Sequence, residues 1–172
     1  ARVDVALGLT NTGEGYGGSW GDYDGDGDLD IYVLNNGQDA LFRNNGSPTF
    51  SFTRVDTSLG VVDSVPNAGC AWADYDRDGD LDIFVSTFAA TPNQDFFYRN
   101  DGTTFTRADA ALGMTEDVGS GNVAWGDYDG DGDLDLFVTS AGQDFLWRND
   151  GAVFTRVGSA VIDARGEIAL DS

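Results

Sequence analysis

The chain has 172 residues, about one domain, and its 41% hydrophobic content is enough for a folded core and argues against disorder. Thirty acidic residues stand against nine basic ones, all arginine, giving a formal net charge of −21, so nucleic acid and anionic membranes are not expected as partners. No membrane-spanning segment or signal peptide is visible.

The first residues resemble a phrase that recurs downstream. Ala1-Arg-Val-Asp-Val-Ala-Leu-Gly8 matches Thr106-Arg-Ala-Asp-Ala-Ala-Leu-Gly113, which follows the last strand of a repeated unit. We therefore expect about residues 1–10 to form the outer strand of a preceding unit, with its edge unpaired and open to a partner.

An acidic phrase comes next, at Trp20–Asp30, and it recurs at Trp72–Asp82 and Trp125–Asp135. Each copy places five aspartates at alternate positions of nine residues, so the carboxylates converge as the chain turns. Ca²⁺ takes six to eight oxygen ligands, which such a turn can supply. We predict three Ca²⁺ sites, with these ligands: Asp22, Asp24, Asp26, Asp28, Asp30, Asp74, Asp76, Asp78, Asp80, Asp82, Asp127, Asp129, Asp131, Asp133 and Asp135.

The exits of the three loops exclude an EF-hand. The acidic side chain that closes an EF-hand at position twelve is replaced by Val33, Val85 and Val138. The segments that follow are rich in β-branched and aromatic residues, which predicts strands rather than helices. Mg²⁺ is less suitable because it demands a strict octahedron, and zinc or copper is disfavoured because the chain has no histidine and one cysteine.

The rest of the unit also repeats. An Arg-Asn-x-Gly turn phrase and a Phe-Thr-Arg phrase follow each loop, so each unit of about 52 residues offers four short antiparallel strands. Four strands at this period are typical of a β-propeller blade, and the predicted fold is all-β with the loop between the first and second strands. The expected array is residues 11–57, 58–110 and 111–160 as three blades, and 161–172 as the first strand of an incomplete blade.

The units resemble FG-GAP/VCBS repeats, the calcium-binding blades of integrin-α-type propellers, and are close to the form in bacterial secreted and cartilage acidic protein-like proteins. The resemblance implies that the aspartates at loop positions one, three, five and nine bind Ca²⁺ together with the position-seven carbonyl. All fifteen aspartates fall on matching positions. Arg77 replaces the glycine found at Gly25 and Gly130; its side chain is expected to point outward and at most to weaken binding slightly.

Three classes of function are compatible with this pattern. We favour a non-catalytic extracellular scaffold for adhesion or assembly, because loops this numerous suit millimolar calcium outside the cell. The alternative is a lectin-like propeller in which Phe42, Tyr98 and Trp147 stack on sugars, although their repeated position suits a core between blades. An enzyme is disfavoured because Glu14, Glu116 and Glu167 are isolated.

Partners are expected to be further blades of a longer chain or other copies of this one, with glycans or extracellular proteins as further options. Uncapped repeats associate with neighbours, so the 172 residues could belong to a longer propeller, to a six-bladed ring of two copies, or to a head-to-tail filament.

Overall fold

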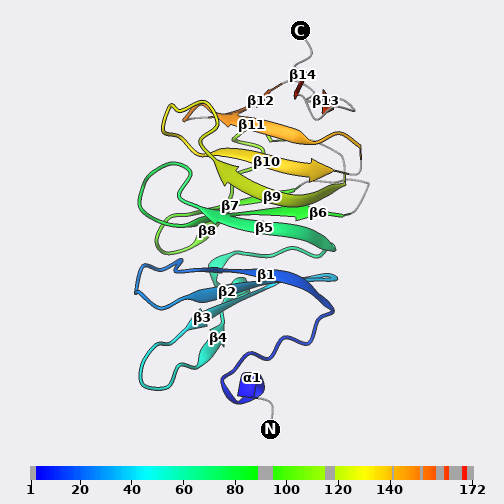
Figure 1. Ribbon diagram of the computed structural model, residues 1–172. Helices are drawn as coiled ribbons and strands as arrows, with labels where there is room; N and C mark the ends of the chain where they lie inside the picture. Colours follow the sequence, from blue (N-terminus) through cyan, green and yellow to red (C-terminus); the bar gives the residue numbers. More distant parts are fainter. Residues whose placement is uncertain are drawn as a thin grey trace.

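The structure is a computed structural model that describes residues 3–88, 95–114, 119–140, 142–151, 153–157, 161–162 and 168–169. Three four-stranded antiparallel sheets are stacked on one another (Figure 1), and this confirms the all-β fold with four strands per repeat. We call them blades 1, 2 and 3.

The strands of each blade follow one another in chain order and in space. Their bounds are β1 (Gly15–Gly21), β2 (Asp30–Asn35), β3 (Ala40–Asn44) and β4 (Phe52–Arg54) in blade 1; β5 (Asn67–Ala73), β6 (Asp82–Thr87), β7 (Phe96–Asn100) and β8 (Phe105–Arg107) in blade 2; and β9 (Ser120–Gly126), β10 (Asp135–Ser140), β11 (Phe145–Asn149) and β12 (Phe154–Val157) in blade 3.

The same register holds in all three blades. Each repeated tryptophan lies opposite the second residue of the next strand, so Trp20 faces Ile31 and Trp72 faces Ile83. The turn between the third and fourth strands contains a glycine with positive φ, for example Gly102 at 79°, a conformation that costs glycine little. The repeated Arg-Asn-x-Gly phrase is thus the turn that the sequence predicted.

The hydrophobic core lies between the blades. β1 contacts β5, and β5 contacts β9, so the first strands line up along the stack. One buried cluster fills the space between blades 1 and 2 and includes Tyr32 and Phe105; a second fills the space between blades 2 and 3 and includes Phe84 and Phe154. Each blade therefore completes its core only against a neighbour.

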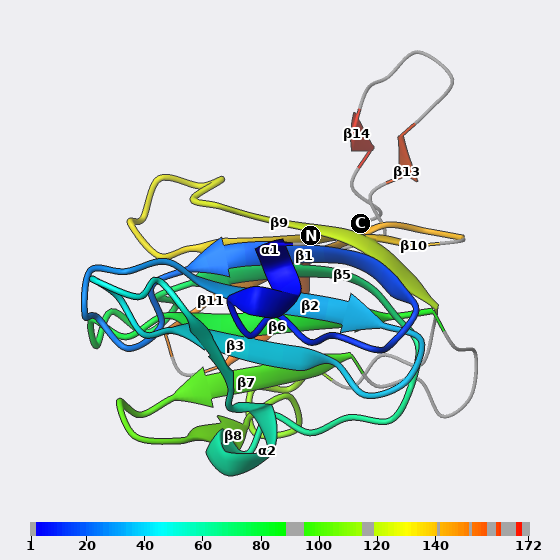
Figure 2. The same ribbon diagram turned by 90° about the horizontal axis from the view of Figure 1, so that it is seen from below.

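The expectation of a strand at residues 1–10 is wrong for the described part of that range, because α1 (Val3–Ala6) is helical. Leu7 and Leu9 both donate main-chain hydrogen bonds to the main-chain oxygen of Asp4, and Gly8 ends the turn with φ 91°. The chain therefore folds back, and Phe52 N donates to Leu7 O at 2.6 Å, which fixes the turn on β4. Figure 2 shows α1 over the strands of blade 1.

α2 (Asp56–Leu59) is the counterpart of α1 between blades 1 and 2. Its main-chain oxygen at Asp56 accepts a hydrogen bond from Val61 N, and Gly60 ends it with φ 85°. The Arg-x-Asp-x-x-Leu-Gly phrase thus encodes a helical turn that connects consecutive blades.

Parts of the sequence predictions fall outside the described residues. Of the segment 161–172, the structure describes β13 (Val161–Ile162) and β14 (Ile168–Ala169), which pair with each other in a separate two-stranded sheet. Glu116 and Glu167 also lie outside the described residues.

Candidate metal centre

The three acidic loops project from the same end of the stack, on the left in Figure 1. Each loop connects the first strand of a blade to the second, as the sequence predicted. Glycines with positive φ, such as Gly27 at 92° and Gly132 at 93°, let the chain turn sharply enough for alternate side chains to point to one centre.

Each loop brings three carboxylates together. One oxygen of each member lies within 4.8 Å of the others, a spacing at which they can share a cation. The groups are Asp22, Asp24 and Asp30; Asp74, Asp76 and Asp78; and Asp127, Asp129 and Asp135.

The aspartate at position nine also anchors the loop to its blade. Asp30 is fully buried, and its two oxygens accept hydrogen bonds from Tyr23 N at 3.1 Å and Asn44 N at 2.7 Å. The carboxylate therefore ties the start of the loop to the end of β3. The same pair of bonds occurs at Asp82 and at Asp135.

Burial makes these anchoring carboxylates reluctant to ionise in the absence of a cation. Burial is the largest cause that raises the pKa of Asp30 to about 6 and that of Asp82 to about 7, while the main-chain hydrogen bonds act in the opposite direction. Burial and the neighbouring Asp26 also raise the pKa of Asp24. The loops therefore hold carboxylates whose ionised form is disfavoured chiefly by burial and also by neighbouring charge, a cost that a bound cation would offset.

The first aspartate of the loop carries the observation that tests whether a cation fits. In blade 1, Asp22 Oδ2 accepts a hydrogen bond from Gly27 N at 3.0 Å, but Asp22 Oδ1 is buried and has no hydrogen-bond partner. In blade 2, Asp74 Oδ2 binds Gly79 N at 3.2 Å, and Asp74 Oδ1 is again buried without a partner. A buried anionic oxygen without a donor is costly, so these oxygens fit a cation.

The remaining predicted ligands lie outside the three carboxylate groups. Asp26 and Asp131 accept hydrogen bonds from main-chain nitrogens two residues on, which shapes the loop. Asp28 and Asp80 lie beside the turn glycines Gly46 and Gly102 rather than at the centre. In this structure their carboxylates are not at the site, which is compatible with a main-chain role for position seven.

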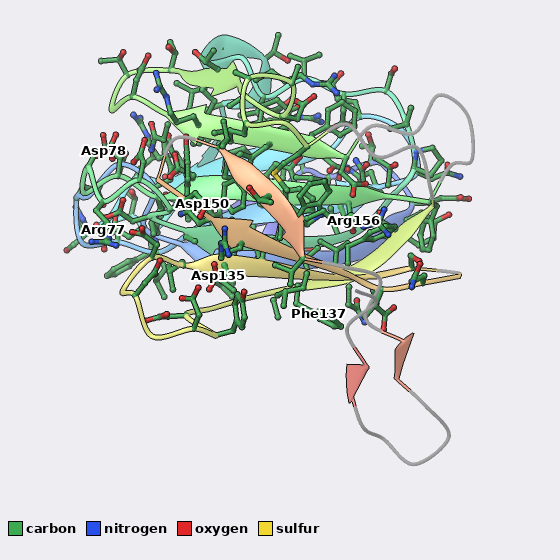
Figure 3. All side chains as sticks on the ribbon, turned by 90° about the horizontal axis from the view of Figure 1, so that it is seen from above. Arg77, Asp78, Asp135, Phe137, Asp150 and Arg156 are labelled. Carbon is green, nitrogen blue, oxygen red and sulfur yellow. The ribbon has the colours of Figure 1, made fainter. Side chains whose placement is uncertain are left out.

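Arg77 connects two loops. Its side chain is 57% exposed, as expected for an outward position, but its guanidinium also forms an ion pair with Asp133 in the loop of blade 3. Arg77 has φ 60°, a left-handed conformation in which the other two loops have glycine. Figure 3 shows Arg77 and Asp78 together at the loop end of the molecule.

An asparagine that no sequence pattern predicted joins the loops of blades 1 and 2 to the following blade. Asn100 Nδ2 donates to Tyr23 O at 2.8 Å, and Asn149 Nδ2 donates to Tyr75 O at 2.9 Å. The acceptors are the second residues of the preceding loops. Asn100 and Asn149 belong to the repeated Arg-Asn-x-Gly phrase, whose pattern predicts a turn but no contact with another blade.

A second missed group lies between blades 1 and 2. The Asp39 and Asp63 carboxylates are 1% and 6% exposed, and Asp39 N donates to Asp63 Oδ1 at 3.4 Å. Asn67 Nδ2 donates across the interface to Asp39 Oδ2 at 2.8 Å. Asp39, the aspartate of the Gln-Asp pair just before β3, therefore contributes a contact between blades.

The aromatic residues considered for sugar stacking are part of the cores. Phe42, Tyr98 and Trp147 are 0%, 1% and 6% exposed. Their rings cannot stack on a ligand at the surface, so these residues supply no sugar-binding site. Glu14 is exposed and accepts a hydrogen bond from Asn36 Nδ2 at 3.2 Å.

These features define a class of protein: an all-β repeat protein built from propeller-like blades with an acidic loop between the first two strands. A family model described as FG-GAP-like repeat matches residues 22–85, 87–138 and 127–169, and the chain therefore belongs to the FG-GAP repeat family. This family generally comprises structural or binding modules rather than enzymes. No curated protein matches the chain. In the described part of the chain, no helix has the length and apolar content needed to cross a membrane.

Proposed function

We propose that this chain is a non-catalytic, extracellular structural module that binds Ca²⁺ in its three loops and joins further blades or copies into a larger assembly. The observation that carries the proposal is the unpaired, buried oxygen of Asp22 and of Asp74 beside two further carboxylates. FG-GAP repeats are typical of extracellular proteins and often bind Ca²⁺, which supports both the location and the metal.

The donor set favours a hard cation. Each group offers carboxylate and main-chain oxygens and neither nitrogen nor sulfur. When bound, Ca²⁺ supplies two positive charges and accepts six to eight oxygens, so Asp22, Asp24 and Asp30 would hold it in the first loop. Three such ions would bring the formal charge from −21 to −15.

The structural role follows from the position of the loops. Each loop is fixed to its own blade by the position-nine aspartate, and the loops of blades 1 and 2 are joined to the following blade by Asn100 and Asn149. Repulsion among unneutralised carboxylates would loosen both connections. Metal binding is therefore expected to stabilise the blade and its junction together.

A melting experiment in calcium and in chelator tests the proposal. One site at a hundredfold excess of ligand over Kd adds about 2.7 kcal/mol, and 1 kcal/mol raises the Tm of a protein of this size by about 2–4 °C. We expect a large fall in Tm on chelation, reversed by Ca²⁺ and less by Mg²⁺. An unchanged Tm would contradict the proposal.

Two substitutions in one loop make the test specific. Asp22→Asn replaces an anionic carboxylate at the centre with a neutral amide and should reduce both the calcium-dependent Tm shift and the number of sites found by isothermal titration calorimetry. Asp28→Asn makes the same change of charge beside Gly46 and should leave a full set of sites. Equal effects of the two variants would indicate a general charge effect instead of a site.

A further inference from the structure

The two outer faces of the stack are complementary. The outer face of blade 1 corresponds to the faces that blades 2 and 3 bury against the blade before them. The outer face of blade 3 corresponds to the faces that blades 1 and 2 bury against the blade after them. The packing between blades is therefore a template, seen twice in one chain, for what these faces bind.

The first part of the template is a tryptophan. Trp72 Nε1 donates to Ser19 O at 3.3 Å, and its ring packs against Tyr23 and Tyr32 of blade 1. Trp125 Nε1 donates to Ala71 O at the same distance, and its ring packs against Phe97 of blade 2. Each junction therefore places an indole on the preceding blade and pairs its N–H with the same main-chain position.

The second part is the asparagine and phenylalanine that accompany the tryptophan. At the first junction, Asn100 donates to Tyr23 O and the Phe105 ring lies 5.7 Å from the Tyr23 ring. At the second junction, Asn149 donates to Tyr75 O and the Phe154 ring lies 5.9 Å from that of Tyr75. Two hydrogen bonds and one aromatic pair thus recur at both junctions.

Blade 1 carries the same three groups with no blade before them in the described residues. Trp20 is 55% exposed, and among the described residues its Nε1 has no acceptor. In the described part of the chain, Asn44 Nδ2 binds Leu29 O alone. Asn100 and Asn149 bind the main-chain oxygen equivalent to Leu29 O and also the loop of the preceding blade. The Trp20 ring lies 6.3 Å from that of Phe52, so the three groups share one face.

Blade 3 carries the groups against which such a tryptophan packs at the other two junctions. A pocket of about 200 Å³ is lined by Ala124, Tyr128, Phe137 and Leu146. The first three occupy the positions of Ser19, Tyr23 and Tyr32, which contact Trp72, and Leu146 occupies that of Phe97, which contacts Trp125. Tyr128 is 50% exposed, whereas Tyr23 and Tyr75 are 7% and 5% exposed. Figure 3 looks onto this end of the stack and shows Asp135 and Phe137 along β10.

Two glycines at the same position of blades 1 and 3 differ in whether a tryptophan ring lies against them. A Cβ added to Gly21 would lie 2.9 Å from the Trp72 ring, because the indole occupies that space. A Cβ added to Gly126, at the same position of blade 3, meets none of the described residues within 4 Å. The pocket is therefore shaped for a tryptophan that blade 3 itself does not supply.

We infer that a second copy of this chain docks head to tail, with its Trp20 in the pocket of blade 3, Trp20 Nε1 on Ala124 O and Asn44 Nδ2 on Tyr128 O. The inference deepens the proposed function, on which it rests for the neutralisation of the loops that border the pocket. Two copies at −21 each repel one another, so association should strengthen with Ca²⁺ and with salt.

Sedimentation velocity over a range of concentrations in excess calcium and salt tests the inference. Wild type should form species larger than a dimer as its concentration rises. Trp20→Ala, which removes the inserted side chain, and Gly126→Leu, which fills the pocket, should each weaken association about tenfold or more. Tyr16→Ala, a control on an exposed aromatic of the same strand, should associate like wild type.

Mixing the two variants gives the sharpest readout. Trp20→Ala keeps the pocket and Gly126→Leu keeps the tryptophan, so an equimolar mixture can form one junction and should give dimers and nothing larger. Circular dichroism and the calcium-dependent Tm establish that each variant is folded. Wild type that stays monomeric at every concentration, or a mixture that stays monomeric, would overturn the inference and leave these faces to blades of another chain. The proposed calcium function would still stand if the Tm shift persisted, and would fall separately if it did not.

Discussion

The side chain of Asn149 donates a hydrogen bond of 2.9 Å to the main-chain oxygen of Tyr75, 74 residues earlier in the chain and inside the acidic loop of the preceding blade. The same amide also reaches Leu134 O at 3.3 Å, and its oxygen accepts Gly151 N at 2.9 Å. One buried side chain therefore joins the turn of its own blade to the loop of another.

Asn149→Ala should lower the free energy of unfolding by about 1–3 kcal/mol, because the buried Tyr75 carbonyl loses its donor. Denaturant unfolding in excess calcium measures the change. At concentrations where the chain is monomeric, Asn44→Ala is the matched control, since among the described residues Asn44 Nδ2 binds Leu29 O of its own blade and no loop of another blade. Equal losses in the two variants would mean that the bond between blades contributes nothing.

Arg77→Gly should tighten calcium binding in the adjacent loop of blade 3. The guanidinium now pairs with Asp133, and its positive charge opposes a cation nearby. Stability should change by less than about 1 kcal/mol, because the lost ion pair is exposed and worth about 0–1 kcal/mol while glycine relieves the left-handed conformation. Isothermal titration calorimetry measures the affinities. Arg77→Gln, which keeps a long side chain without the charge, should reproduce the gain in affinity; weaker binding in both variants would contradict the prediction.

Acid should release the cation before it unfolds the chain. Burial raises the pKa of Asp30 to about 6 and that of Asp82 to about 7. Below these values Asp30, a member of the first carboxylate group, and Asp82, which anchors the second loop, carry protons that oppose binding of a cation. Affinity should therefore fall as pH drops through 7 to 5, by up to about tenfold per pH unit for each such ligand. Calorimetric titration at these pH values, in buffers of different ionisation enthalpy, measures both the affinity and the number of protons released. An affinity that does not change with pH would contradict the prediction that acid releases the cation.

The buried pair between blades 1 and 2 should act in the opposite direction. Burial raises the pKa of Asp39 to about 7, to which the Asp63 charge adds, and burial raises the pKa of Asp63 to about 6, against about 3.9 in the unfolded chain. The folded chain therefore binds more protons, and this pair's contribution to stability is fully present below about pH 4 and is lost as pH rises towards 7.

Asp63→Asn removes one carboxylate of the Asp39–Asp63 pair and should reduce the fall in stability as pH rises. Tm is measured from pH 5 to 8 in saturating calcium, so that changes in loop occupancy contribute little. Tyr32 and Asn67 also face the pair, and both remain in the variant. Glu14→Gln makes the same change of charge at an exposed site and should follow the wild-type pH curve; a parallel curve for Asp63→Asn would disprove the assignment.

Sequence pattern predicts most of what lies within a repeat. Alternating β-branched and aromatic residues after each loop predicted β2, β6 and β10. The spacing of aspartates predicted that the five carboxylates of each loop converge, whereas three of the five form a group in the structure. These features depend on neighbours in sequence, so local pattern encodes them.

Features between repeats were not readable in the same way. Asn100 meets Tyr23 across 77 residues, and a turn asparagine gives no sign of a distant acceptor. Residues 3–6 alternate valine with polar or small residues, which suits a strand, but the helical turn forms because Gly8 reverses the chain onto β4. The pairing of Arg77 with Asp133 likewise depends on how the blades stack.

The repeated junctions also determine how the stack would respond to a pulling force along its axis. Among the described residues, the main contacts between blades join blade 1 to blade 2 and blade 2 to blade 3, so load would pass through these junctions in series and the weakest one would set the rupture force. Since the Tyr23 and Tyr75 acceptors of two junctions lie inside acidic loops, a cation bound in either loop would raise the mechanical strength of that junction alone.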